Sequence, residues 1–220
     1  MTVKKAASPA EQVKFQISPP KFQQIELELT GTEPLVIQRF WKKGELMEGM
    51  EKGNQKKKGE KRKPRDFERD YIESLHTSPE GWHGIHAGAF RCALISACRL
   101  VGFKMTLAKL GVFVLSDGRD QDGVPIIRIH GKPKRFDAVT RNANGGMDVR
   151  SRPMFDDWSV NLRVRYDSEM FSAEDIVNLL MRVGMQVGVG EGRPDSKMSA
   201  GQGWGLFSVE TGIKKQRKAS

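Results

Sequence analysis

The sequence predicts one α+β domain with the element order βαββαβ, in which two helices pack on one face of an antiparallel sheet. Three observations support this fold class. Residues 22–30 and 158–166 alternate apolar and polar side chains, which is typical of half-buried strands. Residues 81–102 and 172–184 carry apolar side chains at helical spacing. A glycine-rich stretch, residues 188–205, separates the second helix from the last predicted strand.

The first half of the predicted domain contains one strand, one short helix and one core helix. The strand turns Ile25, Leu27 and Leu29 to the same side. Residues 66–76 form a short amphipathic helix. The core helix ends at Gly102 and buries a stripe of small or apolar side chains. This stripe consists of Ala87, Phe90, Leu94, Ala97, Cys98 and Val101.

The second half begins with two further predicted strands, residues 107–116 and 124–131, which turn residues separate. Residues 141–153 are expected to form a loop with three arginines. The alternating strand that follows exposes Arg163 and Arg165 side by side on its polar face. Neighbouring arginines on a sheet face suit phosphate binding, and they also suit a face that is merely solvated.

The second core helix begins at Ser172, whose spacing to Asp175 is that of a capping box, and it ends at Gly184. Residues 204–210 form the last strand. This order of elements is that of a ferredoxin-like, or RRM-like, fold. The glycine-rich stretch is therefore held by a core helix on one side and by a core strand on the other.

The positive charge of the chain lies mainly outside the predicted core. The formal net charge is +10. Residues 39–65 contain eleven Lys or Arg and four Glu, so we expect a mobile basic insertion after the first strand. Residues 1–21 are predicted to be a flexible basic arm, residues 22–210 the single domain, and residues 211–220 a basic tail. The charge favours nucleic acid or an anionic surface as the partner.

Cysteine usage and hydropathy indicate the compartment. Cys92 and Cys98 lie six residues apart in one predicted helix, which is about 9 Å along its axis and exceeds the roughly 7 Å that a disulfide spans. We therefore expect both thiols to be free. The sequence shows no secretory segment and no apolar run near the ~18 residues of a membrane span. A cytoplasmic location without a membrane partner is predicted.

The glycine-rich stretch is the first candidate binding element. Its eighteen residues hold six glycines together with Arg193, Lys197 and Trp204. Glycines let backbone N–H groups approach phosphate oxygens, and the three side chains would add phosphate contacts and a stacking face. The spacing matches neither GxxxxGK[ST] nor GxGxxG, which argues against a nucleotide-hydrolysing loop. A flexible hairpin connection is the alternative.

A small-residue turn leads into a helix with an arginine, here Arg91, in GWHGIHAGAFRCALISACR. A glycine loop leads into the last strand in GMQVGVGEGRPDSKMSAGQGWGLFSV. In these two segments the chain resembles the RAMP superfamily of CRISPR-associated RNA-binding proteins. The filament-forming backbone subunit of the family is most similar, since it also has a long insertion after the first strand. The chain also resembles small proteins of tailed-phage genomes, which would place it in the host cytoplasm.

This resemblance and the residues together predict a protein that binds single-stranded nucleic acid largely independently of its sequence, with RNA favoured over DNA. We expect copies to assemble side by side as a filament or ring, alone or within a larger ribonucleoprotein. Trp204 or Trp41 would stack on bases. The predicted nucleic-acid-binding residues are Lys42, Lys43, Arg91, Arg163, Arg165, Gly190, Gly192, Arg193, Lys197 and Trp204.

Two other classes of function stay open. A metal-independent endoribonuclease would use His83 or His86 as a general base on a 2′-hydroxyl, as the resemblance to RNA-processing RAMP proteins implies, although both histidines also suit local packing. A phage-type assembly or inhibitor protein would use the fold to bind another protein. No metal or cofactor is predicted, because the acidic residues Asp66, Glu68 and Asp70 alternate with arginines as surface ion pairs do.

Overall fold

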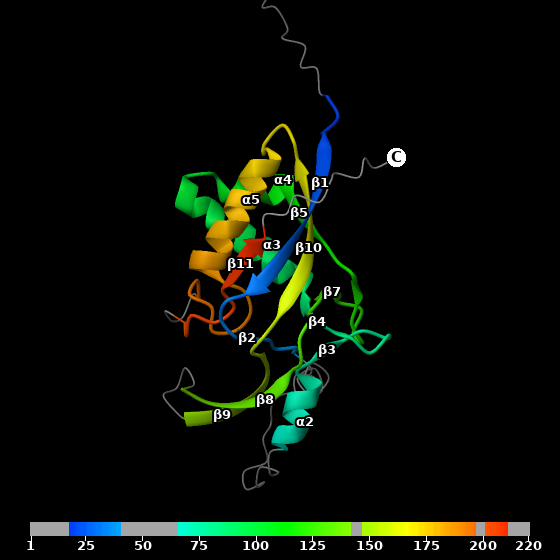
Figure 1. Ribbon diagram of the computed structural model, residues 1–220, viewed down its shortest axis with the longest axis vertical. Coiled ribbons are helices and arrows are strands. Elements are labelled where there is room, and N and C mark those ends of the chain that lie inside the picture. The colour runs from blue at the N-terminus through cyan, green and yellow to red at the C-terminus, as the bar shows by residue number, and fades with distance from the viewer. Residues whose placement is uncertain (1–17, 41–65, 142–146, 197–200, 211–220) are drawn as a thin grey trace, which may run out of the picture.

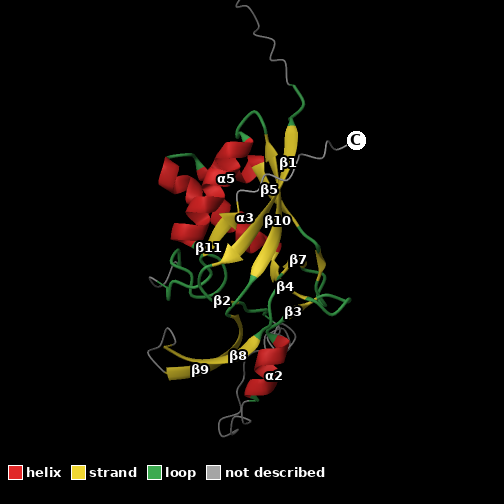
Figure 2. Cartoon of the chain, viewed as in Figure 1, coloured by secondary structure: helices red, strands yellow, loops and turns green. Residues whose placement is uncertain are grey.

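A four-stranded antiparallel sheet lies at the centre of the structure (Figures 1 and 2). The computed structural model describes residues 18–40, 66–141, 147–196 and 201–210. All neighbouring strands of this sheet run antiparallel. From one edge to the other, the strands are β11 (Phe207–Glu210), β1 (Phe22–Gly31), β10 (Ser159–Asp167) and β5 (Val112–Leu115).

Two helices cover one face of this sheet (Figure 2). They are α3 (Ala87–Ala97), which continues as a 3₁₀ turn, and α5 (Ala173–Arg182), which continues as a π-helical turn. The predicted capping box starts α5: the Ser172 hydroxyl accepts the N–H of Asp175, and the Asp175 carboxylate accepts the N–H of Ser172. The other described α-helices are α2 (Phe67–Glu73) and α4 (Met105–Gly111).

The core lies between the sheet and these two helices. Leu27 of β1 lies opposite Leu162 of β10, and Leu29 lies opposite Val160. All four side chains are buried and belong to one cluster with Phe90 of α3. Burying an apolar side chain of this size contributes about 1.5–3 kcal/mol. This layer therefore decides which face of β1 and β10 points toward the helices.

Two smaller antiparallel sheets complete the fold. Backbone hydrogen bonds between His130 and Ser159, 2.8 and 2.9 Å long, join one of them to β10. That sheet contains β3 (His76–Thr77), β4 (His83–His86), β7 (Pro125–Arg128) and β6 (Gly118–Arg119). The other lies with α2 at one end of the molecule (Figure 1) and contains β2 (Leu35–Val36), β9 (Met147–Phe155) and β8 (Lys134–Arg141).

The main predicted elements are confirmed. The chain is α+β, the two core helices and the alternating strands are present, and the glycine-rich stretch connects α5 to β11. Cys92 and Cys98 are both free. No helix among the described residues is long and apolar enough to cross a membrane.

Several predicted segments differ from the structure. Residues 83–86 of the predicted core helix form the strand β4, Val101 of its predicted buried stripe is exposed, and the last strand begins at Phe207. The strand predicted over residues 107–116 begins only at Val112, because the residues before it form α4. The loop predicted over residues 141–153 is mostly the strand β9, which pairs with β8 and, at its end, with β2. The helix predicted over residues 66–76 ends at Glu73, and His76 lies in β3.

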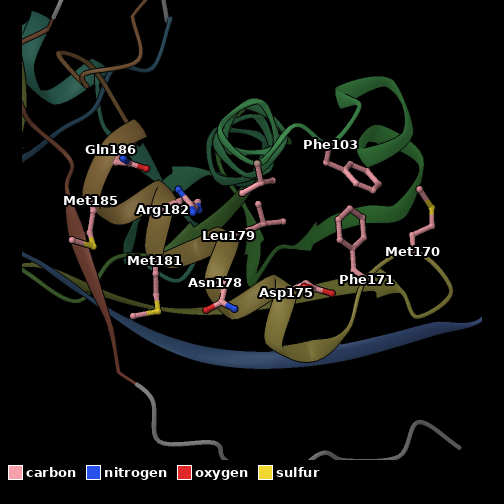
Figure 3. A pocket seen from close by; sticks show the side chains of 11 residues that line it. Phe103, Met170, Phe171, Asp175, Asn178, Leu179, Met181, Arg182, Met185 and Gln186 are labelled. Atoms are coloured by element: carbon pink, nitrogen blue, oxygen red, sulfur yellow. The ribbon is translucent and has the colours of Figure 1, made fainter.

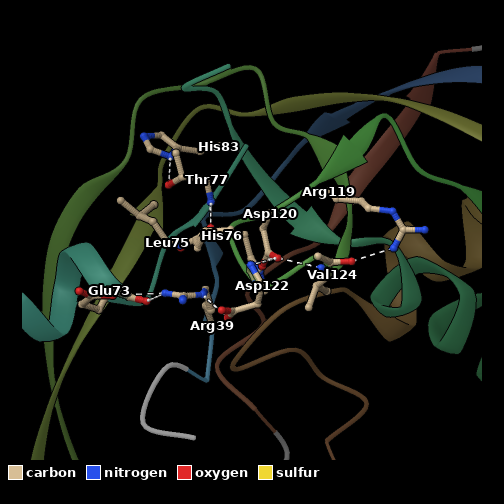
Figure 4. A network of polar contacts seen from close by, with 12 residues as sticks. Arg39, Glu73, Leu75, His76, Thr77, His83, Arg119, Asp120, Asp122 and Val124 are labelled. Carbon is tan, nitrogen blue, oxygen red and sulfur yellow. Dashed lines mark hydrogen bonds and ion pairs between the residues drawn. The ribbon is translucent and has the colours of Figure 1, made fainter. Parts of the chain in front are cut away.

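The predicted mobile insertion, residues 39–65, is wrong at its first residue. Arg39 is buried, and its guanidinium donates to the Asp122 carboxylate at 2.8 Å and to the backbone oxygen of Glu73 at 2.9 Å (Figure 4). Arg39 thus belongs to the folded body, because these acceptors stabilise its buried charge. Phe40 is exposed, and residues 41–65 of the insertion lie outside the described residues, as do most of the predicted arm and all of the predicted tail.

The glycines of the stretch between α5 and β11 allow the backbone to pack closely against other backbone. Gly205 has φ 69°, and a Cβ there would lie 1.8 Å from the backbone oxygen of Val189. Gly190 has φ 81°, and its Cβ would lie 2.5 Å from the backbone oxygen of Val36 in β2. The N–H of Glu191 donates to that same oxygen at 2.8 Å. In these two places the glycines serve contacts within the chain.

Replacing Gly205 by alanine should therefore destabilise the fold more than the same change at Gly203. Both residues have positive φ, 69° and 80°, which costs an alanine about 1–2 kcal/mol at either position. Only at Gly205 does the new Cβ also meet backbone, whereas nothing lies within 4 Å at Gly203. We expect a further loss of roughly 1–3 kcal/mol for Gly205→Ala, measured by urea unfolding. Equal losses in the two variants would contradict the close approach.

Candidate nucleic-acid interface

The face of the central sheet that α3 and α5 leave uncovered carries a mixed set of side chains. Because side chains alternate along a strand, the residues on this face are those whose neighbours point into the core. Most of them are exposed, and the others are partly buried. They are Phe22, Gln24, Glu26 and Glu28 of β1, Asn161, Arg163 and Arg165 of β10, Phe113 and Leu115 of β5, and Ser208 and Glu210 of β11.

Two aromatic rings and two arginines meet at the β5 edge of the sheet, and we call them the aromatic cluster (Phe22, Phe113, Arg91 and Arg165). Arg91 reaches this edge from α3. The rings of Phe22 and Phe113 lie 5.8 Å apart in an edge-to-face arrangement. The Arg165 guanidinium lies 5.1 Å from the Phe22 centroid and 5.0 Å from the Phe113 centroid. The Arg91 guanidinium lies 4.8 Å from the Phe113 centroid. Each distance falls within the range of a cation–π contact.

Arg91 also fixes the chain where α4 turns into β5. Its Nε donates to the backbone oxygen of Val112 at 3.0 Å, and its Nη2 donates to that of Lys109 at 2.6 Å. These oxygens lie at the end of a helix, where carbonyl groups lack helical partners. Arg91 therefore has a structural role, and it also places a positive charge beside Phe113.

Arg163, the second predicted arginine of β10, is held differently from Arg165. Its Nη2 donates to the backbone oxygen of Ser116 at 2.7 Å and to the Asp117 carboxylate at 2.9 Å. It also lies opposite Glu26 of β1. Much of its charge is thus balanced within the chain, and Arg165 is the more available of the two.

The other half of the uncovered face is acidic. Glu26 and Glu28 point outward from β1, and Glu28 lies opposite Glu210 of β11. Together with Arg163 and Arg165, these three glutamates make the face as a whole slightly negative. The sequence prediction of a basic sheet face therefore applies only to its β5 side.

The same contrast holds for the chain as a whole. The described residues include 19 Lys and Arg and 22 Asp and Glu, a net charge of −3. The remaining residues include 18 Lys and Arg and 5 Asp and Glu, a net charge of +13, which gives the total of +10. Trp41, Lys42, Lys43 and Lys197 are among these remaining residues, so the structure does not place them.

The predicted residues of the glycine-rich stretch contact one another. The Arg193 guanidinium donates to the backbone oxygen of Gly190 at 2.9 Å. The Trp204 ring lies 5.4 Å from that of Phe136 and covers Gly192, where a Cβ would lie 2.4 Å from the indole. These residues therefore have partners within the chain.

The glycine-rich stretch and the aromatic cluster lie at opposite ends of β1. The N–H of Gly205 donates to the backbone oxygen of Pro34, beyond the end of β1, whereas Phe22 is the first residue of that strand. A ten-residue strand separates its ends by roughly 30 Å. The structure therefore brings Arg91 and Arg165 together and keeps both apart from Arg193 and Trp204.

The two candidate catalytic histidines are separated by the pleat of β4. The Nδ1 atom of His83 lies 3.1 Å from the hydroxyl of Thr77 on one side of the strand. His86 ends the strand and points to the other side. Burial lowers the pKa of His83. Burial and the nearby charge of His76 lower the pKa of His86, and Asp120 opposes this effect.

His76 and Asp120 form a buried pair that the sequence analysis missed. Their Nδ1 and Oδ2 atoms lie 2.6 Å apart, and both side chains are almost fully buried (Figure 4). His76 is paired in register with Gly84, so His86 is its diagonal neighbour, at the spacing of roughly 7–8 Å that is usual between such positions. Because 44 residues separate the two partners, no local sequence pattern predicts this pair. Among the described residues, no group of three or more His, Cys, Asp or Glu could hold a metal ion.

An open pocket of about 910 Å³ lies on the helical side of the molecule (Figure 3). Phe103, Met170 and Phe171 line one part of it, and Met181 and Met185 line the part along α5. The side chains of Met181 and Met185 are 40% and 74% exposed. Apolar side chains gathered at an open pocket are typical of a protein contact surface.

The buried pair predicts a dependence of stability on pH. Burial alone would raise the pKa of Asp120, but hydrogen bonds from His76 and from the N–H groups of Val124 and Asp122 outweigh it and lower this pKa. The charged carboxylate therefore stabilises the fold above its unfolded-state pKa, near ~4, and this contribution is lost as the pH falls through the lower folded-state pKa.

We expect Asp120→Asn to lose about 1–3 kcal/mol of unfolding free energy at neutral pH and to lose less than the wild type on acidification below pH ~4. Urea unfolding across this pH range measures both effects. Asp157→Asn, at an exposed turn, is the control. A difference between wild type and Asp120→Asn that stays constant down to the lowest pH would contradict the role of the carboxylate.

Comparison with known proteins gives this surface no assignment. No protein-family model matches the chain, and no curated protein matches its sequence. What the surface does has to be inferred from its own residues.

Proposed function

We propose that the chain binds single-stranded nucleic acid, with RNA favoured over DNA and with little dependence on sequence. The observation that carries this proposal is the aromatic cluster. Arg91 and Arg165, two of the predicted binding residues, come from a helix and a distant strand, and both contact Phe113 of the edge strand β5, Arg165 from the uncovered face. Cations and aromatic rings on one open surface suit both the phosphates and the bases of a single strand.

We further propose a ferredoxin-like, RAMP-like domain. If β1, β5, β10 and β11 are numbered one to four along the chain, their order across the sheet is 4-1-3-2. α3 lies between the first and second of these strands, and α5 lies between the third and fourth. This order supports the βαββαβ fold. The position of the glycine-rich stretch between α5 and β11 agrees with the resemblance of the sequence.

In this proposal the charge of the chain has two parts. The residues outside the described part carry the +13 that would attract a polyanion over a distance and account for most of the salt dependence. Lys42, Lys43 and Lys197 are among these residues. The described body, at −3, contributes local contacts at the aromatic cluster rather than general attraction.

Side-by-side assembly as a filament or ring is also proposed. The open pocket beside α5 supports it, because Met181 and Met185 leave apolar surface exposed there. The same observation supports the alternative of a protein-binding assembly or inhibitor protein. Light scattering with increasing lengths of RNA separates the two: mass that grows with strand length supports assembly along the strand.

Binding of labelled single-stranded RNA, single-stranded DNA and duplex, followed by fluorescence anisotropy over a salt series, tests the main proposal. We expect a single-strand preference and a steep salt dependence. Arg165→Ala should weaken binding about 2- to 30-fold. Arg119→Ala removes an exposed arginine from β6, which belongs to one of the two smaller sheets, and should leave the affinity unchanged. Weak wild-type binding that ignores strandedness would overturn the proposal.

A metal-independent endoribonuclease is the second candidate, favoured by the lowered pKa of His86 beside the His76–Asp120 pair. It predicts RNA cleavage in the presence of a metal chelator. His83 and His86 point to opposite sides of β4. His86→Ala should therefore abolish RNA cleavage, and His83→Ala should leave the cleavage rate unchanged. Intact RNA after prolonged incubation would exclude this candidate.

A further inference from the structure

We infer that Phe22 and Phe113, with the Arg165 guanidinium, form a stacking site for an unpaired nucleobase. We also infer that the glutamates on the same face keep the phosphate chain on its β5 side. This inference rests on the proposed function and adds to it the part of the nucleic acid that is recognised and the path that the strand takes.

The two rings are placed outside the apolar core. Neither Phe22 nor Phe113 belongs to the buried cluster beneath the helices, and Phe22 is 40% exposed. Single exposed phenylalanines are common on protein surfaces. The two rings lie 5.8 Å apart, are inclined at 69° to one another and share one guanidinium, so aromatic surface and a cation, both of which bases contact, lie side by side.

The site is held rigidly by its strands. Arg165 lies between its neighbours, opposite Phe113 of β5 and opposite Gln24 of β1. Near the start of β1, the N–H of Ser168 donates to the backbone oxygen of Lys21 at 2.8 Å. The two hydrogen bonds from Arg91 fix the start of β5 on the other side. A base would therefore meet a surface that is already ordered, which lowers the entropic cost of binding.

The chemistry of the face selects a single strand. Every base has a π-face, so stacking tolerates any sequence, whereas the bases of a duplex are already stacked on one another. Glu28 and Glu210 lie opposite one another on the same face and repel phosphates near β11. The bound nucleic acid would then run past β5 and β10, where Arg165 and the partly exposed Arg163 lie.

Substitutions at Phe113 test the stacking site. We expect Phe113→Leu to weaken binding of oligouridylate about 5- to 100-fold, because a leucine cannot stack. The slope of log K against log salt should not change, since no phosphate contact is lost. Phe113→Tyr keeps the ring and should bind within about twofold of the wild type. Phe22→Leu, at an exposed strand end where little core packing is at risk, should also weaken binding.

Glu28→Gln tests the path of the strand and should tighten binding at low salt, because it removes a repelling charge from the face. Oligothymidylate of the same length is measured beside the RNA, so that stacking common to both can be told from recognition of the ribose.

The outcomes separate this inference from the proposed function. If the wild type binds single strands and both leucine variants bind equally well while remaining folded by circular dichroism, the stacking site is wrong and the proposed function stands. If the wild type binds no single strand, both fall. If Phe113→Leu weakens binding but Phe113→Tyr does so equally, the ring acts by packing and the stacking inference is overturned.

Discussion

The antiparallel pairing of β1 with β10 determines most of what this molecule presents to its surroundings. The two strands are in register from Phe22 opposite Asp167 to Thr30 opposite Ser159. Because side chains alternate with a period of two, a shift of the register by one residue would move every core side chain to the solvent face. The burial of Leu27 and Leu162 against the helices therefore fixes the outward direction of Arg165 as well. Core and candidate interface are two consequences of one pairing.

The edge strands divide the outward face into two halves. β5 pairs with the end of β10 that lies beside the start of β1, and it contributes Phe113. β11 pairs with the other end of β1 and contributes Glu210. Each edge strand is only four residues long, so β5 does not extend to the residues that pair with β11, and β11 does not extend to those beside β5. The chemical difference between the halves thus follows from where two short strands attach to two long ones.

The sequence patterns predicted elements whose apolar residues follow a single period, and they missed those that depend on distant partners. β10 alternates strictly and was predicted to within one residue, and α5 carries both its stripe and its capping box. In β9, residues 151–155 are all buried, because β9 packs on both faces, and this leaves no alternation to recognise. Short apolar runs such as that of α4 fit a helix or a strand equally well.

Of the candidate site, the sequence indicated Arg91 and Arg165 as separate binding residues and gave no sign that they share a neighbour. That neighbour, Phe113, follows from the order of the strands, which no local pattern encodes. The His76–Asp120 pair was missed for the same reason. For Arg193 and Trp204, by contrast, the sequence predicted contacts with nucleic acid. The structure adds partners within the chain that account for the positions of both side chains.

The opposite charges of the described body and of the remaining residues make the molecule its own electrostatic complement. A body at −3 and remaining residues at +13 would attract one another, within one chain and between two copies of it. If the chain binds nucleic acid as proposed, the polyanion and the acidic body would compete for the same lysines and arginines. Ionic strength would then weaken both attractions at once, so that self-association and nucleic-acid binding would be linked equilibria.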